Sequence, residues 1–271
     1  MENANGHVHD FDKISHSYRD RWRKKVWQLL LVLFIAAACA YYSGIFDIRR
    51  ISEGVPDLFS LLGEMLPPDF NNATSWVKPI LDTLAMSVGG TSLAILFSLP
   101  LAFLAARNTS PHPLCYRAAR LMLNFLRSIP ELIMGIIFVA AVGFGALPGV
   151  LALGFHSIGM VGKFFAESIE HVDPAPVEAV TSSGVGKLSA IYHGVLPQVL
   201  PQMIDTAIYR WEYNFRASTV MGMVGAGGIG FELISSLRLM CYQEVAAILL
   251  LILLAVTLVD ALSSLLRKHS K

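Results

Sequence analysis

The sequence predicts an all-α integral membrane protein with about six transmembrane helices. Of its 271 residues, 54% are hydrophobic and only 15% are charged, which is a low charge content for a water-soluble domain of this length. Apolar stretches of about 18 residues or more recur, the length that an α-helix needs to cross about 30 Å of hydrocarbon. These stretches are continuous, whereas the strands of a membrane barrel alternate between apolar and polar residues.

Six segments are long and apolar enough to form the expected spans, and the fourth is short and rich in glycine. They are Val26–Ile45, Ile80–Ala106, Leu121–Phe144, Val150–Phe165, Val199–Val224 and Val245–Leu266. Ala38-Cys39-Ala40, in the first of them, looks like a signal-peptide cleavage region. Because a long tail precedes this span, we expect an uncleaved helix.

These spans divide the chain into a tail (residues 1–25), a first helix with an external segment (26–79), a core transmembrane domain (80–266) and a C-terminal tail (267–271). We expect Met1–Ser17 to be a loose or interfacial arm, and its three histidines, His7, His9 and His16, predict no metal site. Proline and asparagine residues in Asp47–Pro79 predict turns, and the apolar patch at Leu58–Leu66 predicts a helix on the membrane surface.

The distribution of lysine and arginine predicts the orientation in the membrane. Thirteen of these residues fall on one side and four on the other if both termini are cytoplasmic. The larger set is Lys13, Arg19, Arg21, Arg23, Lys24, Lys25, Arg107, Arg117, Arg120, Lys187, Arg267, Lys268 and Lys271, and the smaller is Arg49, Arg50, Lys78 and Arg238. An odd number of spans would place one basic terminus outside.

Composition and spacing argue against several other classes. The net charge of +1 gives no global attraction to nucleic acid. Cys39, Cys115 and Cys241 are far apart in sequence and have no metal-ligand spacing, so we expect neither a disulfide framework nor a metal site.

Two glycine motifs resemble nucleotide sites without meeting their requirements. Gly225–Gly230 fits G-x-G-x-x-G, but it follows an apolar helical span and not the strand that a dinucleotide site needs. Gly186-Lys187 is similar to the end of a P-loop, yet Leu188 stands where Ser or Thr is required and Thr181 where Gly is required. We therefore expect no ATP site in this chain, so an ATP-driven function would need a partner.

A polar loop at residues 167–197 separates the fourth and fifth spans and is the first candidate site. Val177–Val180 predicts a short helix after Pro176, with Glu178 near its N-terminus, where a negative charge is favourable. Gly184 can adopt a positive φ and turn the chain, and Pro197 precedes the fifth span. The candidate residues of this loop are Glu178, Ala179, Gly184, Leu196 and Pro197. A solvated connecting loop is the alternative.

Ionisable residues within the spans form a second candidate site. A charge in a membrane is costly, so it usually pairs with another charge or lines a wet path. Arg127 with Glu131, and Glu212 with Arg216, have the four-residue spacing that allows pairing on one helix face. The alternative is an anion path lined by arginine, whose fork matches phosphate oxygens. Arg210 and His156 complete this candidate translocation path.

The glycines at 225, 227, 228 and 230 form a third candidate site. Glycine lets helices approach closely and lets the backbone bend where protein shields it. We expect Gly225, Gly227, Gly228 and Gly230 to form a gate or a tight corner between helices near the outer end of the fifth span. Upstream, Asn214 and Ser218-Thr219 could form hydrogen bonds between helices.

The loop resembles the cytoplasmic "EAA" loop of ATP-binding-cassette (ABC) importer permeases, in its Glu178-Ala179, Gly184 and Leu196-Pro197 positions. Val180 stands where a second Ala is usual, and Gly194 where Ile is usual. Further strings resemble the phosphonate and phosphite branch of these permeases. They are Arg127-Ser128-Ile129-Pro130-Glu131, Leu151-Ala152-Leu153-Gly154-Phe155-His156, Gly194-Val195-Leu196-Pro197-Gln198-Val199-Leu200-Pro201, and the run from Ser218 to Gly230.

The resemblance implies a type I importer fold with cytoplasmic coupling helices, in the bacterial inner membrane. It also implies that the loop couples the permease to an ATPase through Glu178, Ala179, Gly184, Leu196 and Pro197. It implies a permease homodimer, two cytoplasmic ATPase subunits that bind ATP and Mg²⁺, and a periplasmic binding protein. The expected function is therefore the permease subunit of an importer for phosphonate or a related phosphorus oxyanion, such as phosphite or a phosphate ester. The chain itself would not be an enzyme.

Two alternatives come from other classes. A secondary transporter could be driven by protons through Glu131, Glu212 or His156, and would work without an ATPase. A membrane enzyme is the other alternative, but no catalytic triad, zinc motif or carboxylate pair supports it.

Overall fold

The computed structural model describes residues 3–269, and side chains from residue 21 to residue 268. All regular elements in this range are helical. The chain divides into two compact units, Met1–Gly63 and Glu64–Lys271, which are described separately below.

The first unit consists of a long helix followed by an amphipathic one. Helix α1 (Asn3–Tyr42) contains the first candidate span, 21–42. The described part of the tail is helical and not loose, whereas an interfacial position for it stays a prediction. The side chains of the three tail histidines lie outside the described residues. Helix α2 (Ile48–Glu64) buries no residue, and Ile51, Val55 and Leu58 recur on one face at helical spacing. Such a helix suits a membrane surface, and that position stays a prediction.

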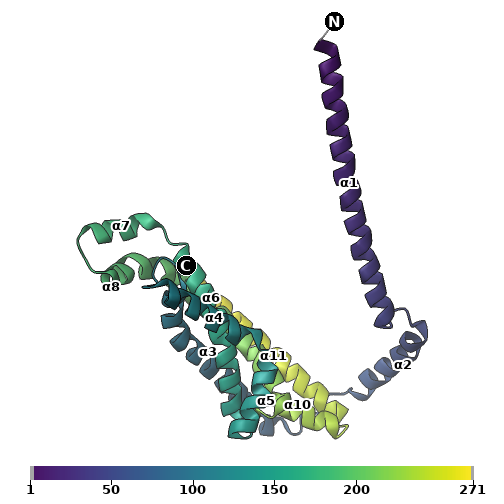
Figure 1. Cartoon of the computed structure of the whole chain (residues 1–271). Helices are drawn as coiled ribbons and strands as arrows, with labels where there is room; N and C mark the ends of the chain where they lie inside the picture. The colour runs from purple at the N-terminus through teal and green to yellow at the C-terminus, as the bar shows by residue number, and fades with distance from the viewer. Residues whose placement is uncertain (1–2, 270–271) are drawn as a thin grey trace. The chain divides into compact units, whose positions relative to one another are not determined.

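The second unit contains the remaining helices. They are η1 (Ala73–Trp76), α3 (Val77–Ala105), α4 (Pro113–Ser128), α5 (Glu131–Val142), α6 (Ala146–Glu170), α7 (Pro174–Ser182), α8 (Lys187–Ala190), the π-helix η2 (Ile191–Val195), α9 (Leu196–Met221), η3 (Gly222–Val224), α10 (Ile229–Arg238) and α11 (Tyr242–His269). In Figure 1, α7 and α8 project from one end of the helix bundle, near the C-terminus, and α5 and α10 lie at the other end.

The candidate spans confirm the predicted fold class and correct one prediction. Four described helices are long and apolar enough to cross a membrane, and up to six spans result if each of two bent helix pairs counts as one. The third span is not a continuous helix, because α4 and α5 meet at 86°. Pro130 has no amide hydrogen and forces Ile129 into an extended conformation, which ends α4 at Ser128. The fourth span is longer than predicted.

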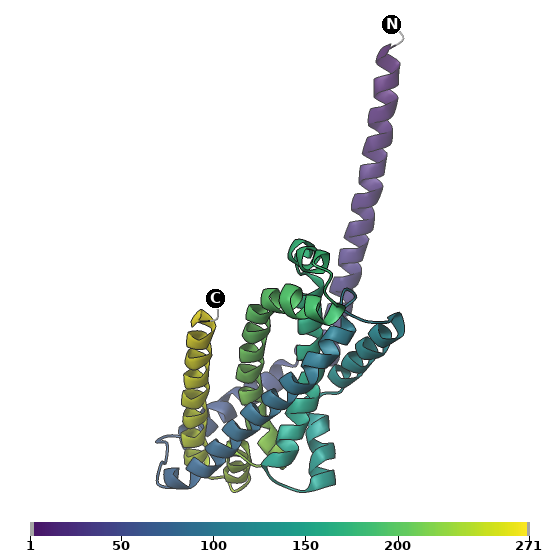
Figure 2. The same cartoon turned by 90° about the vertical axis from the view of Figure 1, so that its left-hand side faces the viewer.

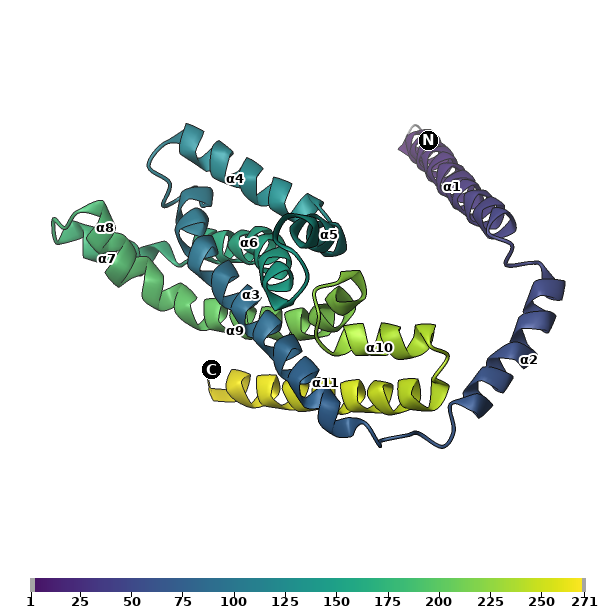
Figure 3. The same ribbon diagram turned by 90° about the horizontal axis from the view of Figure 1, so that it is seen from below.

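The core of the second unit lies where α3, α6 and α9 pack against one another. Seen from below, α4 and α5 lie beside α6, while α10 and α11 lie beyond α9 (Figure 3). The turned view in Figure 2 shows α9, in green, next to α11, in yellow. At the closest contact, a Cβ on Gly90 would lie 2.9 Å from Leu153 Cβ and 3.3 Å from Gly154 N. Small residues therefore let α3 and α6 approach closely, as in other membrane bundles.

A glycine corner connects α9 to α10, which are bent by 43°. Gly225, Gly227 and Gly228 have φ values of 98°, 75° and 74°. A Cβ on Gly230 would lie 1.7 Å from Thr219 O, a distance that the backbone cannot accommodate without moving. The structure thus places the predicted glycines in a tight corner between helices, at the bend within the fifth span. Whether the corner also acts as a gate stays a prediction.

Gly230→Ala is expected to destabilise the second unit by about 3 kcal/mol, because a backbone clash cannot be relieved by side-chain rotation. Thermal unfolding of the detergent-purified protein measures this loss. Gly186→Ala is the matched control, because a Cβ there meets open space. Equal melting temperatures for Gly230→Ala and the unsubstituted protein would contradict the packing described for this corner.

Candidate functional site

The segment from α7 to η2 is the first candidate site, and its leading helix starts earlier than expected. Asp173 caps α7 by accepting a hydrogen bond from Ala175 N at 3.0 Å, and Pro174 occupies the first turn. Glu178 therefore lies in the middle of the helix, so the prediction that it lies near the N-terminus is wrong. Its neighbour Ala179 is exposed, as Glu178 is. Both residues are accessible to another protein.

The chain reverses after α7. Gly184 has a φ of 77° and supplies the turn, as its residue type predicted. The short helix α8 then continues through the π-helix η2 into α9, where Leu196 and Pro197 form the first turn. Leu196 packs against the core cluster, whereas Pro197 is exposed. The two antiparallel arms make a helical loop that projects from the bundle (Figure 1).

The base of this loop is tied together by one glutamine and one close contact. Gln198 accepts a hydrogen bond from Asp173 N at 3.0 Å, and its amide group donates to Asp173 O at 3.3 Å and to Gly194 O at 2.6 Å. A Cβ on Gly194 would lie 3.1 Å from Val177 Cα. Gly194, which departs from the usual Ile, therefore allows η2 to lie directly against α7.

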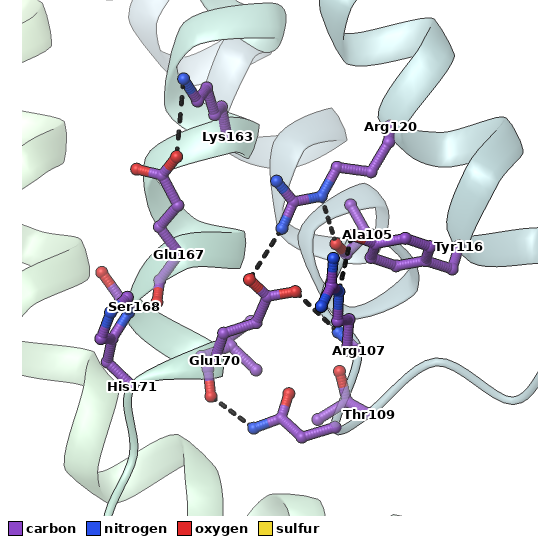
Figure 4. Close-up of polar contacts among 12 residues, drawn as sticks. Ala105, Arg107, Thr109, Tyr116, Arg120, Lys163, Glu167, Ser168, Glu170 and His171 are labelled. Atoms are coloured by element: carbon purple, nitrogen blue, oxygen red, sulfur yellow. Dashed lines mark hydrogen bonds and ion pairs between the residues drawn. The ribbon is translucent and has the colours of Figure 1, made fainter. Parts of the chain in front are cut away.

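A polar cluster braces the end of α6, just before α7 (Figure 4). One oxygen of Glu170 accepts a hydrogen bond from Arg107 N at 2.9 Å, and the other pairs with Arg120 at 2.9 Å. Arg120 also donates to Ala105 O at 2.8 Å, and the ring of Tyr116 lies 5.3 Å from its guanidinium. The Tyr116 hydroxyl contact raises the pKa of Arg107. These contacts fix the α3–α4 connection to the root of the projecting loop.

A second candidate site lies inside the bundle, around Arg210 of α9. Arg210 is 5% exposed and donates from Nε to Ser157 Oγ at 2.8 Å. Ser157 in turn donates to Asn214, which donates to Thr91 on α3 at 2.9 Å. The predicted hydrogen bonding of Asn214 between helices is therefore confirmed. The guanidinium carbon of Arg210 also lies 4.3 Å from the centre of the Tyr213 ring.

Glu131, at the start of α5, faces this arginine. Tyr213 donates a hydrogen bond to Glu131 Oε1 at 3.2 Å. Glu131 Oε2 lies 3.9 Å from Arg210 Nη2 and 3.9 Å from His156 Nε2, which are ion-pair distances but not hydrogen-bond distances. His156 Nδ1 contacts Ile129 O at 3.0 Å, so that nitrogen carries a proton. A cavity of about 160 Å³ adjoins Arg210 and His156.

The structure separates the six predicted path residues into two groups and one outlier. Glu131, His156 and Arg210 come together as described. Glu212 instead bonds to Arg216, its predicted partner, and accepts from Ser263 at 2.8 Å on α11. Arg216 also pairs with Asp260 at 2.8 Å, so this second group joins α9 to α11.

Arg127 is the outlier, since it is exposed on α4. Its predicted pairing with Glu131 is wrong, because the helix ends between the two residues. Arg210 and Glu212 are two residues apart on α9. Because an α-helix turns by about 100° per residue, their side chains point in nearly opposite directions.

Several residues of both sites were missed from the sequence. Asp173-Pro174 is a recognisable helix start, and this signal would have placed α7 correctly. Tyr213 lies three residues after Arg210, so its place on the same helix face could have been inferred. Nothing in the sequence indicated that Gln198, Ser157 or Glu170 would reach their partners, because these contacts join elements that are distant along the chain.

Gln198→Ala is expected to speed amide hydrogen exchange in α7 by about tenfold. The substitution removes three hydrogen bonds worth about 1–3 kcal/mol together, and about 1.4 kcal/mol corresponds to a factor of ten. Gln202→Ala, one turn later on α9, is the matched control, because Gln202 is exposed and its side chain forms no hydrogen bond with any described residue. Unchanged exchange in α7 of the Gln198 variant would show that the glutamine does not hold the loop.

Comparisons with known proteins fit this architecture. The chain is 63% identical over 250 residues to the phosphite transport system permease protein PtxC of Stutzerimonas stutzeri, covering 92% of this chain and 91% of the relative. It is 44% identical to the phosphate-import permease protein PhnE of Mycolicibacterium smegmatis, covering 80% of this chain and 41% of the relative. The solved MetNI methionine ABC transporter shares the fold, with a TM-score of 0.62 and 19% identity over 72% of this chain and 96% of that one.

A family match extends over most of the chain. Residues 98–271, which include both candidate sites, match the binding-protein-dependent transport system inner membrane component family. This family consists of permease components of ABC importers, and the comparisons do not support the alternative of a proton-driven secondary transporter. The chain belongs to the family of binding-protein-dependent transport system inner membrane components.

Proposed function

We propose that this permease passes a small phosphorus oxyanion across the membrane, with phosphite as the first candidate and phosphonate or a phosphate ester as related ones. The observation that carries the proposal is the 63% identity to a phosphite permease over 92% of the chain. Phosphite, phosphonate and phosphate esters all present tetrahedral oxyanions, for which arginine is a suitable ligand. A buried arginine beside a cavity in the bundle supports this substrate class.

The partners follow from the same proposal. Two cytoplasmic ATPase subunits bind ATP and Mg²⁺, a periplasmic protein delivers the substrate, and two copies of this chain form the membrane pore. Family membership supports an ATPase and a binding protein as partners. The absence of a complete P-loop in the sequence supports placing ATP on another subunit. The chain is then a transport component, and the chemistry of hydrolysis belongs to its partner.

In this proposal the α7–α8 loop receives the motion of the ATPase. A coupling element must be exposed to bind its partner and must be firmly attached to transmit force. Glu178 and Ala179 are exposed on α7, while Gln198 and the Glu170 cluster fix both ends of the loop. Closure of the ATPase dimer would move the loop as a rigid body and switch the bundle between inward- and outward-facing states.

We also place both termini in the cytoplasm. The C-terminus and the α7–α8 loop lie at the same end of the bundle, which supports a common side for both (Figure 1). The excess of lysine and arginine in the tails and in the α3–α4 connection favours the cytoplasmic side for that end.

Gly184→Val is expected to leave ATP hydrolysis by the complex in place and to lower uptake at least about tenfold. A β-branched residue is strained at a φ of 77° and would distort the turn between α7 and α8. Gly184→Asn is the matched control, because asparagine tolerates this conformation. Membrane insertion should be equal in both variants. Wild-type uptake by Gly184→Val would show that the turn has no part in coupling.

The substrate class is tested by uptake of ³³P-labelled phosphite into cells that express the chain with its ATPase and binding protein. We expect unlabelled methylphosphonate and hypophosphite to compete better than sulfate, because the binding protein and pore would be matched to phosphorus oxyanions. Cells that lack only this chain provide the control. If none of the phosphorus oxyanions enters in a manner that depends on the chain, the proposed substrate class is wrong.

A further inference from the structure

The cavity beside Arg210 has features of an anion-binding site, and Glu131 lies next to the arginine that lines it. Arg210 is only 5% exposed, yet its Nη2 forms no hydrogen bond with any described residue. A buried charged donor without a partner is costly, so such groups are uncommon unless something else binds them. The unpartnered nitrogen belongs to the residue that lines the cavity.

The opposing carboxylate is also incompletely satisfied. Glu131 Oε2 is buried and forms no hydrogen bond within the described structure, although it lies 3.9 Å from Arg210 Nη2. Both groups are fixed by other contacts, which explains why they do not close on each other. Ser157 and the Tyr213 ring hold the guanidinium, and the Tyr213 hydroxyl holds Glu131 Oε1. Arg210 Nη2 is therefore attracted to Glu131 but forms no hydrogen bond with it.

The size and lining of the cavity suit a small anion. Its volume is about 160 Å³, and a water molecule takes about 30 Å³ of liquid, so there is room for a tetrahedral oxyanion with one or two waters. His156, Thr206, Tyr209 and Tyr213 supply further polar groups, and the rest of the lining is apolar, from Met160, Val161 and Phe164. Arg216, the other arginine of α9, offers no such site, because Glu212 and Asp260 already occupy its guanidinium.

We propose that this cavity is a transport subsite for a small tetrahedral oxyanion, which binds Arg210 Nη2 in competition with Glu131. In the empty permease Glu131 neutralises the buried arginine. When the anion enters, it binds Nη2, and Glu131, whose Oε2 lies 3.9 Å from that nitrogen, repels it. This repulsion keeps binding weak, as conduction requires a site that the substrate can leave. The inference rests on the proposed oxyanion substrate and adds where in the membrane it binds.

The test measures phosphite binding to the purified permease–ATPase complex, without binding protein, by isothermal titration calorimetry. Arg210→Gln should weaken binding at least about tenfold, because it removes the donor and its charge, and Glu131→Gln should tighten binding by a similar factor, because it removes the repulsion. Arg127→Gln, an exposed arginine on α4, should bind as the wild type does. Size-exclusion profiles establish that each variant is folded.

The proposal predicts opposite effects of the two variants on phosphite affinity. If the ion pair were purely structural, either substitution would weaken binding. Glu131→Gln should also slow uptake of phosphite, since the anion leaves the tighter site less readily. Equal losses of affinity in Arg210→Gln and Glu131→Gln, or no binding to the wild-type complex, would overturn the subsite. If phosphite uptake persists although the complex shows no such binding, the subsite is wrong but the proposed substrate class stands. Failure of the subsite can therefore be distinguished from failure of the proposed function.

Discussion

The close packing of α6 against α3 is the constraint on which the rest of the second unit depends. In a membrane, helices associate through close contact of small residues and a few hydrogen bonds, because lipid is as apolar as their side chains. Gly90 and Gly154 bring the two backbones together, and Ser98 donates a hydrogen bond to Ile158 O at 3.2 Å. Of the apolar window in α6, 61% is buried, against 22% for α11, so α6 is the central helix.

This central helix carries parts of both candidate sites. Near its middle, Ser157 contacts Arg210 and His156 faces Glu131. At its end, Glu170 fixes the α3–α4 connection beside the projecting loop. A rigid helix therefore holds the cavity beside Arg210 and the root of the α7–α8 loop in one body. A movement imposed on the loop would displace α6 as a whole, together with the groups that surround Arg210.

Local sequence patterns predicted the features that depend on residues close together in the chain. They did not predict contacts between residues that are distant in the chain. Apolar runs located the spans, and four-residue spacing identified the Glu212–Arg216 pair. The same spacing failed for Arg127 and Glu131, because Pro130 ends the helix between them and turns the chain by 86°. The approach of Glu131 to Arg210 depends on that turn and on tertiary packing, neither of which the spacing contains.

The central claim is that this chain supplies the membrane path and the coupling loop, while ATP acts on a partner. Proteoliposomes containing the permease, its ATPase and the binding protein test it most directly, by measuring phosphite uptake with ATP trapped inside and with a pH gradient alone. We predict uptake with ATP in the complete complex, and none with the gradient. Uptake driven by the gradient in liposomes that hold this chain without the ATPase would contradict the account.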